Sequence, residues 1–385
     1  MEQLKSPASP TVDGFPDVVR VLLVSPLPPP PGGIQTWTQM LVERGLPAPF
    51  EFEVVDTRVT RRHQDIPPRL NRVELIRFFN ILAAIRRALS SRRFSLIHLN
   101  CAVTYTATPR NLVSTFIART AGVPYVIHLH ATFDPPRGRG VLPRLYRIAY
   151  RMMFGHAAWI LALGEPSYRG ILRLGRYAGK TTPLMPNFVN GRGIPPVVRR
   201  KDGPVCVLFS GALTPAKGIR TIVAAAERLQ DVHFTMVGDG PPDSRAALLD
   251  RIRALGIESR VSVLGPVPQS RVLEMLAESD VFIFPSTTEG FPNSLAEAMA
   301  VGLPVVASPV GAIPEMIDVP DGGFLVPWDD VDGYVRSLRR LLDSPCLREQ
   351  MGSHNRAKAL RDYDYAVVVE RLCSVYRDLL EQPVE

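Results

Sequence analysis

Cysteine is scarce in this 385-residue sequence, which contains four copies. They lie far apart at Cys101, Cys206, Cys346 and Cys373 and form no CxxC pair, so we expect neither a zinc site nor a disulfide framework. The sequence also lacks an apolar run of the roughly 20 residues that a membrane-spanning helix needs. Residues 1–16 contain no long apolar stretch, which favours a flexible tail over a secretory signal. These absences predict a cytoplasmic protein.

The composition is that of an ordinary globular protein, with 46% hydrophobic and 21% charged residues. Because a single hydrophobic core rarely grows beyond roughly 250–300 residues, a chain of 385 residues is expected to form two domains. The 45 Lys and Arg against 37 Asp and Glu give a net charge of +8. This excess favours anionic partners, namely nucleotides, acidic lipids or nucleic acid, but charge does not choose among them.

The first half of the chain alternates between strand and helix patterns. Residues 18–25 form a β-branched run that ends in a Pro/Gly cluster, and Ile34, Trp37 and Leu41 follow at helical spacing. Residues 96–100 and 125–130 are also predicted as strands, with helical patterns between them. This βαβ order predicts a parallel sheet and a Rossmann-like domain over residues 17–190.

A polar linker is predicted at residues 191–203, after which the pattern restarts. Strands are predicted at 205–210, 232–237, 261–264, 281–285 and 305–307, and a helix at 221–229, which gives a second Rossmann-like domain over 204–363. In the last stretch, Val369, Leu372, Val375, Tyr376 and Leu379 share one helical face. We expect residues 364–385 to cross back onto the first domain.

Ligands of open α/β sheets bind beyond the carboxyl ends of the strands, so the loops after the strands are the candidate sites. Gly32 and Gly33 open the first helix and can expose backbone N–H groups to a phosphate, although taken alone they are better explained by an ordinary turn. Lys217-Gly218 begins another helix, where a cation suits a diphosphate, but a solvated lysine is the alternative. Further loops that could expose backbone to a base contain Gly238, Gly265 and Val267.

The loop and helix after the strand at 281–285 are the most informative. Glu289 lies in the loop, and Glu297 lies eight residues later, inside the helix. Between them stand Gly290, Phe291, Asn293, Ser294 and Leu295. This spacing lets Glu289 meet a sugar and Glu297 a ribose, with the positive end of the helix facing a diphosphate between them. Two unrelated surface carboxylates are the alternative.

These motifs resemble those of the retaining, metal-independent GT-B glycosyltransferases of the large paired-glutamate group (family 4-like, group 1). The resemblance covers residues 18–380 and is most specific at 289–307. It implies two Rossmann-like domains facing a central cleft. It also implies that Gly33 lies behind the donor diphosphate, Lys217 neutralises it, Glu297 binds the ribose, and Glu289 with the backbone around Phe291 holds the sugar.

The resemblance also places His130 beside the reacting centre as a catalytic residue together with Glu289. His128, two residues earlier, is expected to face the other side of the same strand and to lie in the core. Two positions depart from the family pattern. Ala212 replaces an arginine of the phosphate loop, for which Arg220 is a candidate substitute, and Pro292 removes one backbone donor from the sugar pocket.

We expect no cofactor, a UDP- or GDP-linked sugar donor as substrate, and no metal, because no Asp-x-Asp cluster stands in a predicted site loop. Charge on the leaving diphosphate would be met by Lys217 and the helix N-termini. Retention of configuration allows a double displacement or a front-face attack. The resemblance favours the second.

The acceptor is expected to be a glycan, a lipid-linked molecule or a small molecule bound to the first domain. Between residues 135 and 164 the chain has five arginines and no acid, and Arg144, Arg147 and Arg151 share a helical face. Apolar surface is expected from Tyr146, Ile148, Ala149, Met152 and Met153. This helix is predicted to lie on an anionic membrane at the inner face, with a solvated basic face as the alternative.

Other functions remain open on the sequence alone. Nucleic-acid binding is not expected, because no aromatic-basic interleaving or known nucleic-acid module is present. A nucleotide-sugar 2-epimerase shares the two-domain architecture but needs no acceptor, and the paired-glutamate loop disfavours it. A non-catalytic donor-binding subunit recruited to a membrane is the second alternative, in which Ala212 would mark a decayed donor site.

Overall fold

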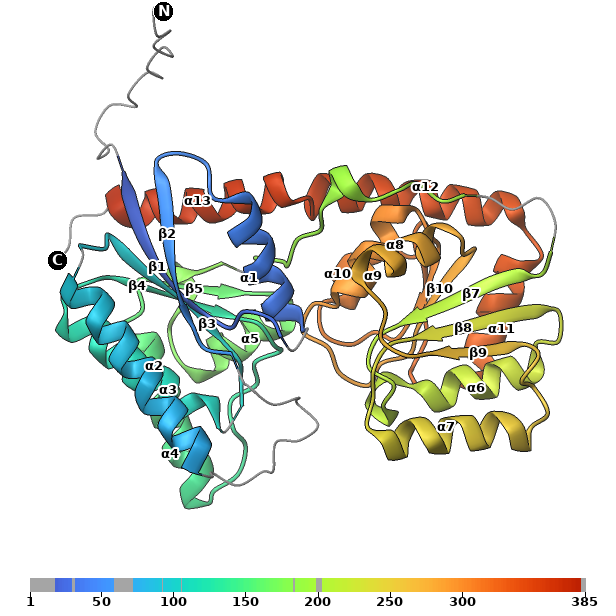
Figure 1. Cartoon of the computed structure of the whole chain (residues 1–385), viewed down its shortest axis with the longest axis horizontal. Helices are drawn as coiled ribbons and strands as arrows, with labels where there is room; N and C mark the ends of the chain where they lie inside the picture. Colours follow the sequence, from blue (N-terminus) through green and yellow to red (C-terminus); the bar gives the residue numbers. More distant parts are fainter. Residues whose placement is uncertain are drawn as a thin grey trace, which may run out of the picture.

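The computed structural model describes residues 18–29, 32–58, 72–91, 93–104, 106–182, 184–198 and 203–381. They contain two six-stranded parallel sheets that lie beside one another, each flanked by helices (Figure 1). The predicted tail at 1–16 and residues 199–202 of the predicted linker lie outside the described residues. The α/β fold class expected from the sequence is confirmed.

The first sheet has the strand order β2-β1-β3-β4-β5-β6. Its strands are β1 (Val19–Ser25), β2 (Phe50–Asp56), β3 (Leu96–Cys101), β4 (Tyr125–Leu129), β5 (Trp159–Ala162) and β6 (Thr181–Thr182). Its helices are α1 (Gly33–Arg44), α2 (Arg72–Ser91), α3 (Ala107–Thr120), α4 (Val141–Gly155) and α5 (Glu165–Leu174). Alternate residues of β1 enter different cores: Leu22 and Val24 pack with α2, α3 and α4, whereas Val21 and Leu23 pack with α1.

The second sheet has the strand order β12-β11-β10-β7-β8-β9. Its strands are β7 (Val205–Ser210), β8 (Val232–Val237), β9 (Val261–Leu264), β10 (Val281–Phe284), β11 (Val305–Ala307) and β12 (Gly323–Leu325). Its helices are α6 (Ile219–Arg228), α7 (Pro242–Ala254), α8 (Gln269–Ala277), α9 (Asn293–Val301), α10 (Ile313–Met316), α11 (Val331–Leu342) and α12 (Pro345–Asp362). Each strand that the sequence predicts is present, and its ends agree to within one residue.

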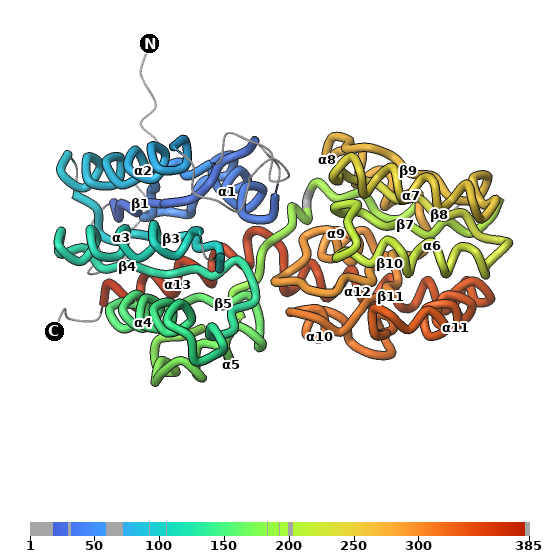
Figure 2. Tube along the Cα trace, turned by 90° about the horizontal axis from the view of Figure 1, so that it is seen from below, coloured from blue at the N-terminus to red at the C-terminus, as the bar shows by residue number. Residues whose placement is uncertain are grey.

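The chain returns to the first domain through α13 (Tyr365–Glu381), which follows α12 along one side of the molecule (Figures 1 and 2). Val369, Leu372 and Tyr376 of α13 are buried in the same core as Trp37 and Leu41 of α1. The apolar face that the spacing of residues 366–380 indicates therefore packs against the first sheet.

Loops after the strands of the two sheets meet between the domains. Thr132, in the loop after β4, donates a hydrogen bond to the carbonyl of Glu289 in the loop after β10. The backbone N–H of Glu165 donates to Oε1 of Glu315 at 2.7 Å. A methyl group on Gly290 would lie 3.0 Å from Cα of Ala131, so the two backbones are close there. The carboxyl ends of both sheets thus face a common boundary.

Candidate active site

Lys217 and Glu289 form an ion pair in this boundary. The Lys217 Nζ to Glu289 Oε1 distance is 2.5 Å, and the side chains are 27% and 8% exposed. Lys217 ends a short 3-10 turn, Pro215–Lys217, after β7, and its Nζ lies 5.6 Å from the centre of the Phe284 ring. The predicted phosphate cation and the predicted sugar carboxylate are therefore neighbours.

Two glycines allow the loops around this pair to pack closely. Gly218 adopts φ 71°, and a methyl group there would lie 2.0 Å from the carbonyl oxygen of Pro285. Gly238, after β8, adopts φ 148°, and its methyl group would lie 1.9 Å from the carbonyl oxygen of Gly211. Any side chain would push these loops apart, so both positions require glycine.

The segment from Gly290 to Leu295 is held by the core. Phe291 is 6% exposed and its ring contacts that of Tyr363 at 5.1 Å, while Leu295 is fully buried. The side chains of these two residues are therefore occupied by core packing. Asn293 is the first residue of α9 and its Oδ1 accepts a hydrogen bond from Nδ2 of Asn187 at 2.8 Å, while Ser294 is partly exposed.

Glu297 lies one turn inside α9, where burial raises the pKa of its carboxyl group to about 7. A hydrogen bond with Gln269, the first residue of α8, opposes this shift. Near neutral pH the group is therefore divided between a neutral and a charged form. Such a carboxyl can donate or accept hydrogen bonds with hydroxyl groups.

Helix N-termini from both domains approach one another. Gly32 caps α1 in an extended conformation, Gly33 begins that helix, and a methyl group on Gly33 would lie 4.0 Å from Nδ2 of Asn293. The positive ends of α1 and α9 therefore point toward one region, which suits an anion. Gly265 and Val267 follow β9, the edge strand of the second sheet. Strands β7 and β8 lie between β9 and β10, so these two residues are the farthest from the Glu289 loop among the predicted donor-binding residues that follow strands of this sheet.

His130 follows β4, and its Nε2 lies 2.9 Å from Oδ1 of Asn100. Burial lowers the pKa of His130 to about 3, so the ring is neutral at physiological pH. The prediction that His128 faces the other side of the strand is wrong, because the two rings lie 4.0 Å apart. Residues at i and i+2 of a strand share a face. His128 is fully buried, as expected.

Sequence reasoning missed the polar cluster behind His130. It comprises Ser25, Thr38, His98, Asn100 and Tyr376, all of them buried, and the Trp37 ring lies 5.6 Å from that of His98 and 5.4 Å from that of His130. A signal was present: His98 and Asn100 stand two residues apart in an apolar strand, as His128 and His130 do in the next. Polar residues at alternate positions of two neighbouring buried strands indicate a shared hydrogen-bond network.

The structure places Ala212, the first departure from the family pattern, and Arg220, its candidate substitute, in different surroundings. Ala212 is exposed in the loop after β7. Arg220 lines a cavity of about 580 Å³ between α6 and α7, together with Asp243 and Arg251. This location gives no support to Arg220 as the substitute for the missing arginine. Among the described residues, no group of three or more His, Cys, Asp or Glu could hold a metal ion.

The basic helix predicted near residue 144 is α4, but two of its arginines bind the protein itself. Arg147 donates to the carbonyls of Pro136 and Gly138 at 2.7 and 3.0 Å, and Nε of Arg151 donates to the carbonyl of Leu174 at 3.2 Å. The expectation that Met153 supplies surface is wrong, because its side chain is buried in the core beneath α4. This burial follows from helical spacing, which places it on the side of Tyr150 and Phe154.

The exposed apolar surface of the first domain is larger than the sequence indicated. It spans α2, α3 and α4, which lie side by side (Figure 2). Its members are Val73, Leu75, Ile76, Phe79, Phe116, Val141, Leu142, Leu145, Ile148 and Met152. We call these residues the apolar face. Nine arginines and one glutamate occur on the same three helices, which gives them an excess of positive charge. No described helix has the length and apolarity to span a membrane.

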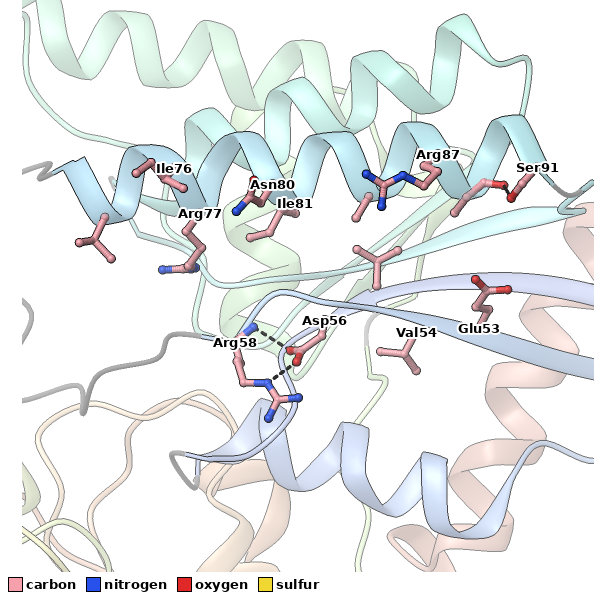
Figure 3. A pocket seen from close by; sticks show the side chains of 14 residues that line it. Glu53, Val54, Asp56, Arg58, Ile76, Arg77, Asn80, Ile81, Arg87 and Ser91 are labelled. Carbon is pink, nitrogen blue, oxygen red and sulfur yellow. Dashed lines mark hydrogen bonds and ion pairs between the residues drawn. The ribbon is translucent and has the colours of Figure 1, made fainter.

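A groove with a volume of about 580 Å³ lies between β2 and α2 (Figure 3). Asp56 and Arg58 form an ion pair at the carboxyl end of β2, and Arg77 of α2 lies above them. Val73 and Ile76 line the groove and also belong to the apolar face. The groove therefore connects the site edge of the first sheet with that exposed surface.

Comparison with known proteins identifies both halves of the chain. Residues 17–187 match the glycosyl transferase 4-like domain, and residues 204–344 match the glycosyl transferases group 1. Over 193 residues the chain is 35% identical to D-inositol 3-phosphate glycosyltransferase of Acidothermus cellulolyticus, which covers 47% of this chain and 42% of that protein. Over 308 residues it is 26% identical to the putative colanic acid biosynthesis glycosyltransferase WcaL of Salmonella typhimurium, covering 70% and 75% of the two chains. The first of these alignments thus spans less than half of the relative.

Solved structures share the two-domain architecture. Sucrose-phosphate synthase of Thermosynechococcus elongatus superposes with a TM-score of 0.73 at 18% identity, covering 94% of this chain and 99% of that one. HepE of Anabaena, in complex with UDP and glucose, gives a TM-score of 0.72 at 18% identity, covering 93% and 99%. These likenesses establish the GT-B fold. With both of its sheets matched by the family's two domains, the chain belongs to the group 1, family 4-like glycosyltransferases.

Proposed function

We propose that this protein transfers a hexosyl or N-acetylhexosaminyl group from a nucleoside-diphosphate sugar to an acceptor, with retention of configuration and without a metal ion. The observation that carries the proposal is the Lys217–Glu289 pair at the boundary between the sheets. The positive ends of α1 and α9 converge there, and Thr132 joins Glu289 to the loop that follows His130. A cation, a carboxylate, helix ends and a neutral histidine are thus gathered from both domains.

The donor would lie across the loops of the second sheet. Lys217 and the N-terminus of α9 would meet the diphosphate, Glu289 the sugar hydroxyls, and Glu297 the ribose. UDP or GDP is the expected nucleotide: HepE is known in complex with UDP, and one relative is named as a mannosyltransferase. The raised pKa of Glu297 fits a group that exchanges hydrogen bonds with hydroxyls rather than an ion pair.

Transfer would break the bond between the anomeric carbon and the diphosphate oxygen and form one to an acceptor oxygen on the same face, while the acceptor's hydroxyl proton passes to the departing diphosphate oxygen. The leaving diphosphate gains negative charge, which Lys217 and the helix ends would stabilise. Positive charge develops on the sugar, near Glu289. With a low pKa, His130 is present as a neutral ring and can orient a hydroxyl group by hydrogen bonding.

The apolar face points to a lipid-linked acceptor delivered from an anionic membrane at the inner face. Exposed apolar side chains on three adjacent helices, surrounded by arginines, are typical of proteins that bind at a membrane surface. The groove between β2 and α2 gives a path from this surface to the site edge. A small-molecule acceptor is supported by the names of relatives such as N-acetyl-α-D-glucosaminyl L-malate synthase.

A donor screen tests the proposal. The purified protein is incubated with UDP-glucose, UDP-N-acetylglucosamine and GDP-mannose, each with and without a bacterial lipid extract, and products are followed by mass spectrometry. We expect nucleoside diphosphate to be released together with a glycosylated product, and the Glu289→Gln variant to abolish both. Conversion of the donor to an epimer without acceptor would establish the epimerase, and donor binding without any turnover would establish the non-catalytic subunit.

A further inference from the structure

A chain of buried hydrogen bonds leads from α1 to His130. The hydroxyl of Thr38 lies 2.9 Å from the carbonyl oxygen of Ile34 and also contacts the hydroxyl of Ser25. Nδ2 of Asn100 lies 2.8 Å from Oγ of Ser25. The three side chains that form these hydrogen bonds, Ser25, Thr38 and Asn100, come from β1, α1 and β3, and none of them is used in the proposed reaction.

The directions of these hydrogen bonds follow from the number of protons. Thr38 has one hydroxyl proton, and the carbonyl of Ile34 can only accept, so Thr38 donates to Ile34. The hydroxyl of Ser25 must then donate to Thr38. It is left as an acceptor for Asn100, so the amide nitrogen of Asn100 faces Ser25. The amide oxygen of Asn100 consequently faces the histidines, and the orientation of this amide is fixed by its partners.

The amide oxygen of Asn100 accepts hydrogen bonds from two histidines. Nε2 of His98 and Nε2 of His130 each lie 2.9 Å from Oδ1 of Asn100. Since a carbonyl oxygen only accepts, both Nε2 atoms must carry protons. In His98 the other nitrogen, Nδ1, is a lone pair that accepts from the hydroxyl of Tyr376 on α13 at 2.6 Å. Every donor of His98 thus has a partner.

His130 differs at its second nitrogen. Its Nδ1 and Oδ1 of Asn187 are buried, and neither has a partner of regular hydrogen-bond geometry among the described residues. The two residues are nevertheless neighbours, because a hydrogen bond with Asn187 opposes the lowering of the His130 pKa. Nδ2 of Asn187 already faces Oδ1 of Asn293 and the carbonyl of Phe291, at 2.8 and 3.4 Å. The oxygen of Asn187 therefore competes with that of Asn100 for the single proton of the ring.

We propose that Asn100 is a positioning residue that fixes His130 as its Nε2–H tautomer, leaving Nδ1 as a lone pair on the side of Asn187 and the donor helix α9. The tautomer decides whether this edge of the ring accepts or donates a hydrogen bond. Because Nδ1 is buried beside Asn187, a sugar hydroxyl would donate to it only after Asn187 moved aside, whereas the other tautomer would give its proton to Asn187. The functional meaning of this assignment rests on the proposed function, in which His130 lies beside the reacting centre.

Nitrogen-15 NMR of histidine-labelled protein tests the assignment directly, because the two tautomers give different nitrogen shifts and couplings. The His130→Gln variant identifies the signals of His130. We expect Nε2–H in the unaltered protein and in Asn100→Asp, which keeps an acceptor oxygen beside Nε2. In Asn100→Leu, of similar size, only Asn187 can accept, so the proton should move to Nδ1. An Nδ1–H signal in the unaltered protein, or Nε2–H retained in Asn100→Leu, would overturn the proposal.

Two matched variants separate this role from general stability. Tyr376→Phe removes the distant end of the network and should leave the tautomer of His130 unchanged, as should Asn187→Ala, which removes the competing acceptor. If Asn100→Leu fails to fold by circular dichroism, the spectra of the unaltered protein and of Asn100→Asp still decide, since a ring protonated at Nδ1 alone in either contradicts the assignment.

Kinetics then links the tautomer to transfer. With an active donor, Asn100→Leu should lower kcat about tenfold or more and change KM for the donor by less than about twofold, because Asn100 is buried and is not expected to contact the nucleotide. An equal loss in Tyr376→Phe would overturn the positioning role. Absence of transfer by the unaltered protein would contradict the proposed function while leaving the NMR result intact, so the two failures are distinguishable.

Discussion

Replacing Glu297 by glutamine should stabilise the protein and weaken its donor site at the same time. Burial raises the pKa of this carboxyl from 4.5 to about 7. Because the folded state binds a proton more tightly than the unfolded state, stability contributed by this group is complete below pH 4.5 and is lost as the pH rises toward 7. One pKa unit corresponds to about 1.4 kcal/mol, so the full shift corresponds to about 3 kcal/mol.

Glutamine has nearly the same shape and cannot ionise, so it removes this cost above neutral pH. We expect the free energy of unfolding of Glu297→Gln to exceed that of the unaltered protein by up to about 3 kcal/mol at pH 8 and to match it closely at pH 4.5. Urea titrations at the two pH values, followed by circular dichroism, measure this difference. An unchanged difference between pH 4.5 and pH 8 would refute the reasoning, since a packing effect does not depend on pH.

The same variant should bind the donor nucleotide less tightly. If Glu297 hydrogen-bonds the ribose, the loss of a charged hydrogen-bond partner should weaken the binding of UDP or GDP by about 1–3 kcal/mol at pH 8. Turnover at saturating donor should survive in part, because the ribose is remote from the reacting bond. Calorimetric titration of the nucleotide measures the affinity. Stabilisation without any loss of affinity would remove Glu297 from the ribose site.

Four further changes test other parts of the site and the surface. Lys217→Ala should lower the affinity for UDP at least about tenfold but leave the affinity for uridine nearly unchanged in calorimetry, because the lysine is expected to contact only phosphate. Equal losses of affinity for both would refute this role. Glu289→Gln should lower kcat by about two orders of magnitude or more while UDP still binds; near-normal turnover would contradict its part in catalysis. Donor binding should persist in a chelator, and its restoration only by magnesium or manganese would show that a metal is needed. Leu142→Ser combined with Leu145→Ser should reduce sedimentation of the protein with phosphatidylglycerol vesicles at least about fivefold. Val319→Ser, at an exposed apolar residue of the second domain, should not reduce it, and equal effects would argue against membrane binding by the apolar face.

Most of the buried strands of both sheets could be predicted from the sequence because they are apolar runs, and β1 and β7 to β10 end directly before a glycine or proline. The four-residue strand β5 is also largely buried but was not predicted. The strand β2 was missed for a physical reason. It lies at the edge of the first sheet, and its segment carries Glu51 and Glu53 among apolar residues. Charged residues on an edge strand discourage further pairing, but they also weaken the strand signal in the sequence. The short edge strands β6 and β12 gave equally little signal.

The candidate site was predictable residue by residue but not as an arrangement. Glycines and charges after each strand marked the loops, since the carboxyl edge of a parallel sheet collects them. The contact between Thr132 and Glu289 joins residues 157 positions apart, and no local pattern indicates such a pairing. The error at His128 came from misapplying the period of a strand. The role of Asn100 required the direction of several hydrogen bonds, which only the structure supplies.

The ion pair between Lys217 and Glu289 couples two subsites that the sequence presents as separate. A diphosphate and the carboxylate of Glu289 would compete for the same Nζ, which now lies 2.5 Å from Oε1. Drawing Lys217 toward the phosphates would leave Glu289, 8% exposed, without its counter-charge in a partly buried setting. Hydrogen bonds from sugar hydroxyls can restore partners to that carboxylate. A complete nucleotide sugar supplies both groups, whereas a free nucleotide supplies only the phosphates, so the pair favours the intact donor over the nucleotide alone.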